Sequence, residues 1–166
     1  MSANLALPNT YYNVSCNQLY ENENAYAVCS TVQNSQSISA GSSQLISYNG
    51  SASAIFQDIT FNSDKTIFTL SKRGVYAVQV EVSVELPATN GAQATLNLLV
   101  NGLTGNGYDV AYASSTTPLG NIKQTIKSFV IQENNLPTNI SVNAGAIIGN
   151  ATFRYANISI FKIAPI

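Results

Sequence analysis

The chain has 166 residues, of which 45% are apolar and only 9% charged, with seven Lys or Arg, eight Asp or Glu and a formal net charge of -1. This length fits one domain with a short appendage, and the apolar fraction is sufficient for a hydrophobic core. Because no Lys or Arg precedes Lys65 and no apolar run is long enough to cross a bilayer, we expect neither nucleic-acid binding nor membrane insertion.

The first 37 residues differ in character from the rest of the chain. They are rich in asparagine and lack a sustained apolar period, which is typical of a mobile tail. They also hold four tyrosines, two cysteines and a short apolar patch, groups that a tail without a partner seldom needs. We therefore predict that residues 1–37 form a connector that docks on another molecule, with contacts from Leu5, Ala6, Leu7, Pro8, Tyr11 and Tyr12.

Both cysteines, Cys16 and Cys29, lie in this connector. Two thiols in a chain without histidine are too few for a metal site, and the Cys-x-x-Cys pattern of a redox enzyme is absent. The thiols are either free, bridged to each other, or bridged between chains, and their spacing does not distinguish these cases. We expect oxidised cysteines that reinforce an assembly.

From Ile38 onward, short strand-like runs alternate with turn residues. Residues 44–48, 55–61 and 66–70 are the first such runs, separated by Asn49-Gly50 and by residues 62–64. The clearest run spans residues 74 to 86, where the apolar side chains fall on one parity: Tyr76, Val78, Val80, Val82, Val84 and Leu86. Successive side chains of a strand point to opposite faces, so these residues line one apolar face of a half-buried strand.

The second half of the chain continues this pattern. Residues 94–100 alternate up to Asn101-Gly102, which is a strong hairpin signal, and further strands are expected at 108–112, 122–132, 139–143 and 151–163. Many short strands with Asn-Gly turns and no helical period predict an all-β fold, a jelly-roll sandwich over residues 38–166.

Two of these strands, at 122–132 and 151–163, are apolar on both faces. In a two-layer sandwich one face of each sheet meets the core and the other meets solvent, so a second apolar face needs a cover. The cover is either another subunit, which we favour, or the N-terminal connector. The candidate residues of a subunit interface are Phe129, Ile131, Ile158, Ile160, Phe161 and Ile163.

Nothing in the sequence resembles catalytic equipment. Histidine is absent and the acidic residues are scattered, so neither a nucleophile with its base nor a pair of carboxylates in one site is evident. The glycines at 102, 105 and 107 lack the Lys-Ser/Thr and the helix of a phosphate loop. We expect no enzyme, no cofactor and no metal; Tyr108-Asp109 is the one hint of a sugar or calcium site.

Three segments together resemble a known family. Gly74-Val75-Tyr76 opening a long strand, the hairpin around Asn101-Gly102 and the terminal strand from Asn157 to Ile163 are similar to the trimeric jelly roll of tumour necrosis factor and the complement-type heads. Within that family the chain looks most like the heads of collagen-like proteins on Bacillus-type spores. The resemblance implies a homotrimer whose axis is lined by the last strand and a neighbouring one.

The chain departs from the collagen-like members because no Gly-X-Y repeat precedes the head. A short N-terminal connector instead resembles the subunits of endospore appendages, in which it joins one jelly roll to the next. That resemblance implies a homopolymer, with other spore-surface proteins as partners at the base or tip of a fibre.

We therefore predict a structural, self-assembling subunit of an extracellular fibre or spore-surface appendage. A trimeric head that binds a receptor or glycan, on a surface or phage fibre protein, is the alternative. No signal peptide is evident in residues 1–8, so either a leader was removed or the protein is released by another route.

Overall fold

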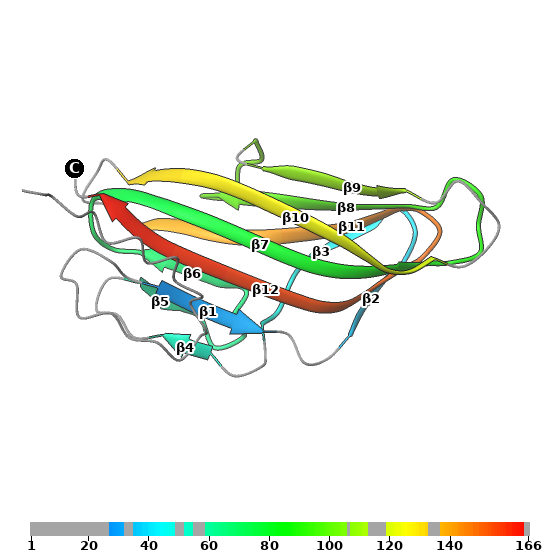
Figure 1. Cartoon of the computed structure of the whole chain (residues 1–166), viewed down its shortest axis with the longest axis horizontal. Coiled ribbons are helices and arrows are strands. Elements are labelled where there is room, and N and C mark those ends of the chain that lie inside the picture. The colour runs from blue at the N-terminus through cyan, green and yellow to red at the C-terminus, as the bar shows by residue number, and fades with distance from the viewer. Residues whose placement is uncertain are drawn as a thin grey trace, which may run out of the picture.

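The computed structural model describes residues 27–31, 35–48, 52–54, 59–105, 107–112, 119–132 and 137–164. These residues form two antiparallel sheets packed face to face, with the long strands running along the long axis of the molecule (Figure 1). The first sheet, called sheet A, has the order β10-β7-β12-β1-β4, and β2 also pairs with β12. The second, sheet B, has the order β5-β6-β11-β8-β9, and β3 also pairs with β11.

The strand bounds are as follows. Sheet A contains β1 (Ala27–Thr31), β2 (Gln36–Ile38), β4 (Ala52–Ala54), β7 (Gly74–Leu86), β10 (Leu119–Gln132) and β12 (Ala151–Ala164). Sheet B contains β3 (Ser42–Leu45), β5 (Ile59–Phe61), β6 (Ile67–Leu70), β8 (Gln93–Val100), β9 (Tyr108–Tyr112) and β11 (Thr138–Ile148).

Strand β7 organises sheet A. It lies between β10 and β12, and its even-numbered residues are buried along its whole length, as the sequence pattern predicts. Those side chains meet the inner face of sheet B, where Leu96 and Leu98 of β8 and Ile140 of β11 are fully buried. The core is thus a layer of aliphatic side chains between two sheets, and the all-β jelly roll predicted from the sequence is confirmed.

The predicted Asn101-Gly102 hairpin is present. Strands β8 and β9 pair antiparallel, and Val100 bridges Leu103 across a turn in which Asn101 and Gly102 both have positive φ angles, 52° and 78°. The short strand predicted at residues 139–143 is in fact the eleven-residue strand β11. Its alternation is obscured because Ser141, Ala144, Gly145 and Ala146 are small enough to be buried on either face.

The predicted domain boundary at residue 38 cuts through sheet A. Strand β1 pairs with β12 from Ala27↔Phe161 to Thr31↔Asn157, and β2 pairs with β12 from Gln36↔Phe153 to Ile38↔Ala151. Strands β1 and β2, which lie before this boundary, are therefore part of sheet A. The sequence does not reveal these two strands because they carry little apolar periodicity of their own. Their position is fixed by pairing with β12.

Asp109 joins the open edges of the two sheets. Its Oδ2 atom accepts a hydrogen bond from the Thr125 backbone N–H at 2.9 Å, and its Oδ1 atom accepts one from its own neighbour Val110 at 2.8 Å. Strand β9 is the edge of sheet B and β10 the edge of sheet A, so the carboxylate satisfies an amide that no strand pairs. The carboxylate that suggested a sugar or calcium site is thus occupied with backbone hydrogen bonds.

We expect Asp109→Ala to lower the free energy of unfolding by about 1.5–3 kcal/mol, because it removes a charged acceptor from an otherwise unpaired amide. Denaturant unfolding of the purified protein measures this. The control is Asp64→Ala, whose carboxylate accepts a hydrogen bond from the exposed Ser63 hydroxyl and should change stability by less than about 0.5 kcal/mol. Equal effects of the two substitutions would contradict this role for Asp109.

Gly74 opens β7 in a conformation that other residues avoid. Its φ angle is +155°, and a Cβ there would lie 2.8 Å from the Ala164 backbone carbonyl oxygen. We expect Gly74→Ala to destabilise the protein by about 2–4 kcal/mol through combined strain and overlap. Gly41→Ala is the control, because Gly41 has a φ of +74° in open space and its substitution should cost only about 1 kcal/mol. Thermal unfolding that ranks them in the opposite order would refute this assignment.

Candidate functional site

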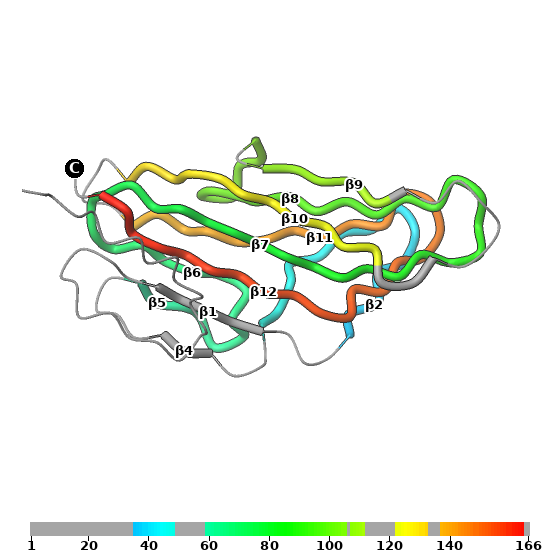
Figure 2. The backbone as a smooth tube through the Cα atoms, in the orientation of Figure 1, coloured from blue at the N-terminus to red at the C-terminus, as the bar shows by residue number. Residues whose placement is uncertain are grey.

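The outward face of sheet A changes character along its length. Where β7 begins and where β10 and β12 end, the outward positions of these strands are apolar, and farther along β7 they become polar. Figure 2 shows that these strand ends lie together at one end of the sandwich. We call the apolar part the outer apolar patch; it consists of Val75, Ala77, Phe129, Ile131 and Phe161, and it is bordered by the exposed Ile163, which lies at a β-bulge of β12.

Strand register places these residues side by side. Phe129 of β10 and Phe161 of β12 both lie opposite Ala77 of β7, and the next row pairs Ile131 with Val75. Because the alanine between them is small, the two phenylalanines border a groove of about 190 Å³. Phe129, Ile131 and Ile163 keep 67%, 56% and 52% of their surface exposed. Such a cluster of large exposed apolar groups is typical of a protein interface.

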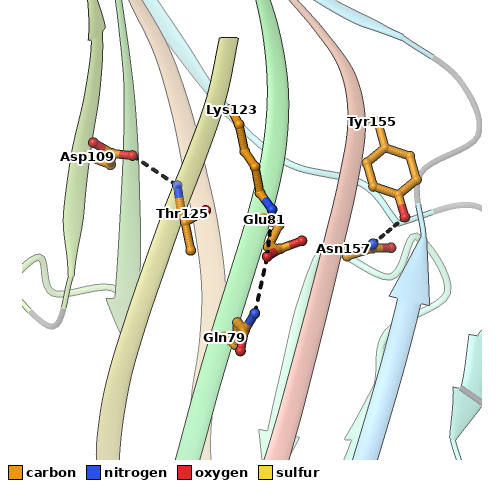
Figure 3. A network of polar contacts seen from close by, with 7 residues as sticks. All are labelled: Gln79, Glu81, Asp109, Lys123, Thr125, Tyr155 and Asn157. Carbon is orange, nitrogen blue, oxygen red and sulfur yellow. Dashed lines mark hydrogen bonds and ion pairs between the residues drawn. The ribbon is translucent and has the colours of Figure 1, made fainter. Parts of the chain in front are cut away.

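The rest of the outward face is polar. Lys123 of β10 forms an ion pair with Glu81 of β7 at 2.9 Å, and the Gln79 amide donates to Glu81 at 3.3 Å (Figure 3). On the neighbouring β12, the Asn157 amide donates to the Tyr155 hydroxyl. The ion pair is largely solvated, so it contributes at most about 1 kcal/mol to stability. Its effect is to make this half of the face suited to water.

Only part of the predicted interface lies on this face. Phe129, Ile131 and Ile163 are exposed and Phe161 is half-buried there. Ile158 and Ile160 are instead fully buried in the core of their own sandwich, which corrects their assignment as interface residues. They occupy inward-facing positions of β12. Apolar residues occupy both faces of this strand only near its C-terminal end.

Two members of the outer apolar patch were missed in the sequence. Val75 and Ala77 occupy the first outward positions of β7, where the later outward residues are Gln79, Glu81, Ser83 and Glu85. The change from apolar to polar along that parity is a signal that could have revealed them.

The remaining predicted site residues lie outside the described residues. These are Leu5, Ala6, Leu7, Pro8, Tyr11, Tyr12 and Cys16, and so their docking role stays a prediction. Cys29 lies on β1 opposite Ser159 of β12, but its side chain is not among those described. The pairing of the two cysteines therefore also stays a prediction.

The titratable groups of the described residues do not form a reactive cluster. Burial raises the pKa of the Tyr48 phenol far above its ordinary value, and the hydrogen bond and charge of Glu85 raise the pKa of Arg154. Both shifts stabilise the form that already prevails at neutral pH. Within the described ranges, no three His, Cys, Asp or Glu side chains converge to hold a metal. The described residues also contain no helix that is long and apolar enough to span a membrane.

Comparison with solved structures identifies the fold. The chain is similar to the globular domain of the zebrafish complement 1qA protein, with a TM-score of 0.55 and 14% identity over 85% of this chain and 99% of that chain. It is also similar to the tumour necrosis factor Eiger from S. frugiperda, with a TM-score of 0.50 and 13% identity over 86% and 93% of the two chains. No protein-family model and no curated protein matches the sequence.

Charge substitutions can test which residues of sheet A face the core and which face outward. Ile160→Asp should abolish cooperative unfolding, because a charge in the fully buried core costs several kcal/mol. Phe129→Asp should retain the β-sheet circular dichroism spectrum and a cooperative transition, because Phe129 is mostly exposed. If Ile160→Asp folds as well as Phe129→Asp, the assignment of Ile160 to the core is wrong.

Proposed function

We propose that this jelly roll of the tumour necrosis factor and complement type is a structural subunit that forms homotrimers and polymerises into an extracellular fibre or spore-surface appendage. The outer apolar patch supplies the trimer contact, and the N-terminal residues supply the contact between trimers. The protein acts by assembly and not by catalysis.

The observation that carries the trimer is the exposure of Phe129 and Ile131 on one face, with the exposed Ile163 at the end of β12. Complete burial of one such side chain contributes about 1.5–3 kcal/mol, and a closed trimer buries three copies of each. The patch also lies on β10 and on β12, the last strand, and the family resemblance implies that the last strand lines the threefold axis. A second copy of the same chain is therefore the partner that this surface suits best.

The fibre is supported by the low charge of the chain and by its N-terminal segment. Few ionic groups are available to keep copies apart, since only 9% of the residues are charged. The segment before Ala27 contains Leu5, Leu7 and tyrosines, which can bury apolar surface while the hydroxyl groups stay hydrogen-bonded. A contact between such a segment and a head uses two different surfaces, so it propagates and does not close.

A trimeric binding head is the second candidate. Leu103 and Tyr108 are both exposed on the β8–β9 hairpin, and apolar side chains on an exposed hairpin are typical of recognition loops. If the protein binds a receptor or a glycan, this hairpin is where the contact is expected.

The trimer is tested by Phe129→Asp in the protein that lacks residues 2–15, in which the proposed fibre contact is absent. The charge would have to be buried in the apolar contact, so we expect dissociation to monomers at micromolar concentration. The control is Thr60→Asp, which places the same charge on an exposed residue of β5 in the other sheet and should leave trimers intact. Light scattering gives the mass of each species. A wild-type protein that is monomeric, or a Phe129→Asp variant that remains trimeric, would contradict the proposed contact.

Removal of residues 2–15 tests the fibre. All described strands begin at Ala27 or later, so the truncated protein should give discrete trimers with unchanged thermal unfolding of the head. Electron microscopy of the full and truncated proteins, side by side, shows which of them forms fibres. Fibres in the truncated sample would mean that polymerisation uses head surfaces alone.

A further inference from the structure

Three turns meet at the end of the sandwich opposite the C-terminus (Figure 2). They comprise residues 39–41, 87–92 and 147–150, and we call this surface the distal pole. The Ala40 N–H donates to Asn150 Oδ1 at 3.1 Å, and the Gly41 N–H donates to the Ala146 carbonyl at 2.7 Å. Gly149 is packed so closely against Pro87 that a Cβ there would lie 2.8 Å from its ring. The distal pole is thus a single packed surface.

Two isoleucines are exposed at the distal pole. Ile147 and Ile148 are consecutive, and they keep 50% and 44% of their surface exposed. The pairing of β11 with β8 passes from Ala146↔Ala94 to Ile148↔Gln93, so Ile147 is the extra residue of a β-bulge. The bulge breaks the alternation that would have buried one of the two side chains. Bulges of this kind commonly re-aim side chains next to functional surfaces.

The distal pole also carries no charge. None of residues 39–41, 87–92 and 147–150 is Asp, Glu, Lys or Arg. The turn between β6 and β7, at the opposite end, contains Lys72 and Arg73. An uncharged segment is therefore better suited to the distal pole than to the other end.

The N-terminal segment has the matching composition. Residues 1–20 contain no charged side chain and include Leu5, Leu7 and three of the nine tyrosines. An apolar stretch that carries hydroxyl and amide groups can cover Ile147 and Ile148 and still pair with the polar turn residues around them.

The direction of β1 puts the attachment point of that segment at the end opposite the distal pole. Ala27, the first described residue, lies opposite Phe161, near the C-terminal end of β12, whereas Ala151 at the start of β12 lies beside the distal pole. The 26 preceding residues are thus attached at the end where the C-terminus lies. Fully extended they could span about 90 Å, roughly twice the length of a 14-residue strand such as β12.

We propose that the distal pole, centred on Ile147 and Ile148, is the acceptor for residues 2–15 of the next copy in a stack. This inference rests on the proposed function and specifies where the N-terminal segment binds. A donor at one end and an acceptor at the other make successive heads point in the same direction, which produces a polar filament.

Cross-linking tests the contact directly. A photoreactive p-benzoylphenylalanine replaces Ile148 in full-length protein labelled with ¹⁵N, which is mixed with unlabelled protein during assembly and then irradiated. Because no Lys or Arg precedes Lys65, cleavage after Glu21 is used to release the N-terminal peptide. We expect label-free residues 2–15 attached to labelled position 148. Cross-links only within one copy, or only to the head of another copy, would overturn the proposal.

Substitutions at the distal pole test whether this surface, and not another surface of the head, accepts the N-terminal segment. In the full chain, Ile147→Asp with Ile148→Asp should weaken the contact by more than about tenfold and leave discrete trimers, because a charge would be buried against an uncharged segment. Ile147→Val with Ile148→Val is the matched control and should still form fibres. Both exposed positions tolerate substitution, and unchanged thermal unfolding verifies that the head is folded.

The outcomes distinguish the two proposals. If the wild type forms no fibres, or forms them without residues 2–15, the proposed function fails and the acceptor with it. If fibres need residues 2–15 but persist in the double aspartate variant, only the distal pole is excluded as acceptor.

Discussion

The strict two-residue alternation of β7, in register with β10 and β12, is the constraint on which the structure depends. Tyr76 to Leu86 commit one face of all three strands to the core, because a slip by one residue would expose every buried side chain. The outward parity is then free to carry function. The outward-facing residues contribute little to the stability of the fold. Their polarity can therefore vary, and this face is apolar at one end and polar at the other.

The boundary between the two halves of this face is sharp. Phe129 and Phe161 flank Ala77, and one step along β7 the side chains are Lys127, Gln79 and Ser159. An apolar band that ended gradually would favour sliding of one copy over another, whereas a sharp limit defines a single register between partners. Glu81 and Lys123 reinforce the limit, since burying them against an apolar surface would be unfavourable.

The sequence predicted the sheets well and the faces less well. Alternation identified β7 and β8 because each has polar residues on one parity, and Asn101-Gly102 identified the hairpin because few other dipeptides suit that turn. On β12, apolar residues on both parities made Ile158 and Phe161 look equivalent, and only the partner sheet distinguishes them. Strand β1 was missed, since its pairing with β12 joins residues about 130 positions apart.

The same reasoning explains why the two proposed contacts differ in kind. The outer apolar patch lies on regular strands, where register fixes every side chain, so it suits a contact repeated identically around an axis. The distal pole is made of turns and a bulge, where the backbone leaves the ladder and exposed apolar side chains lie next to polar turn residues. A closed interface on rigid sheet and an open one on turns would allow the trimer to be stable alone and the filament to depend on the N-terminal segment.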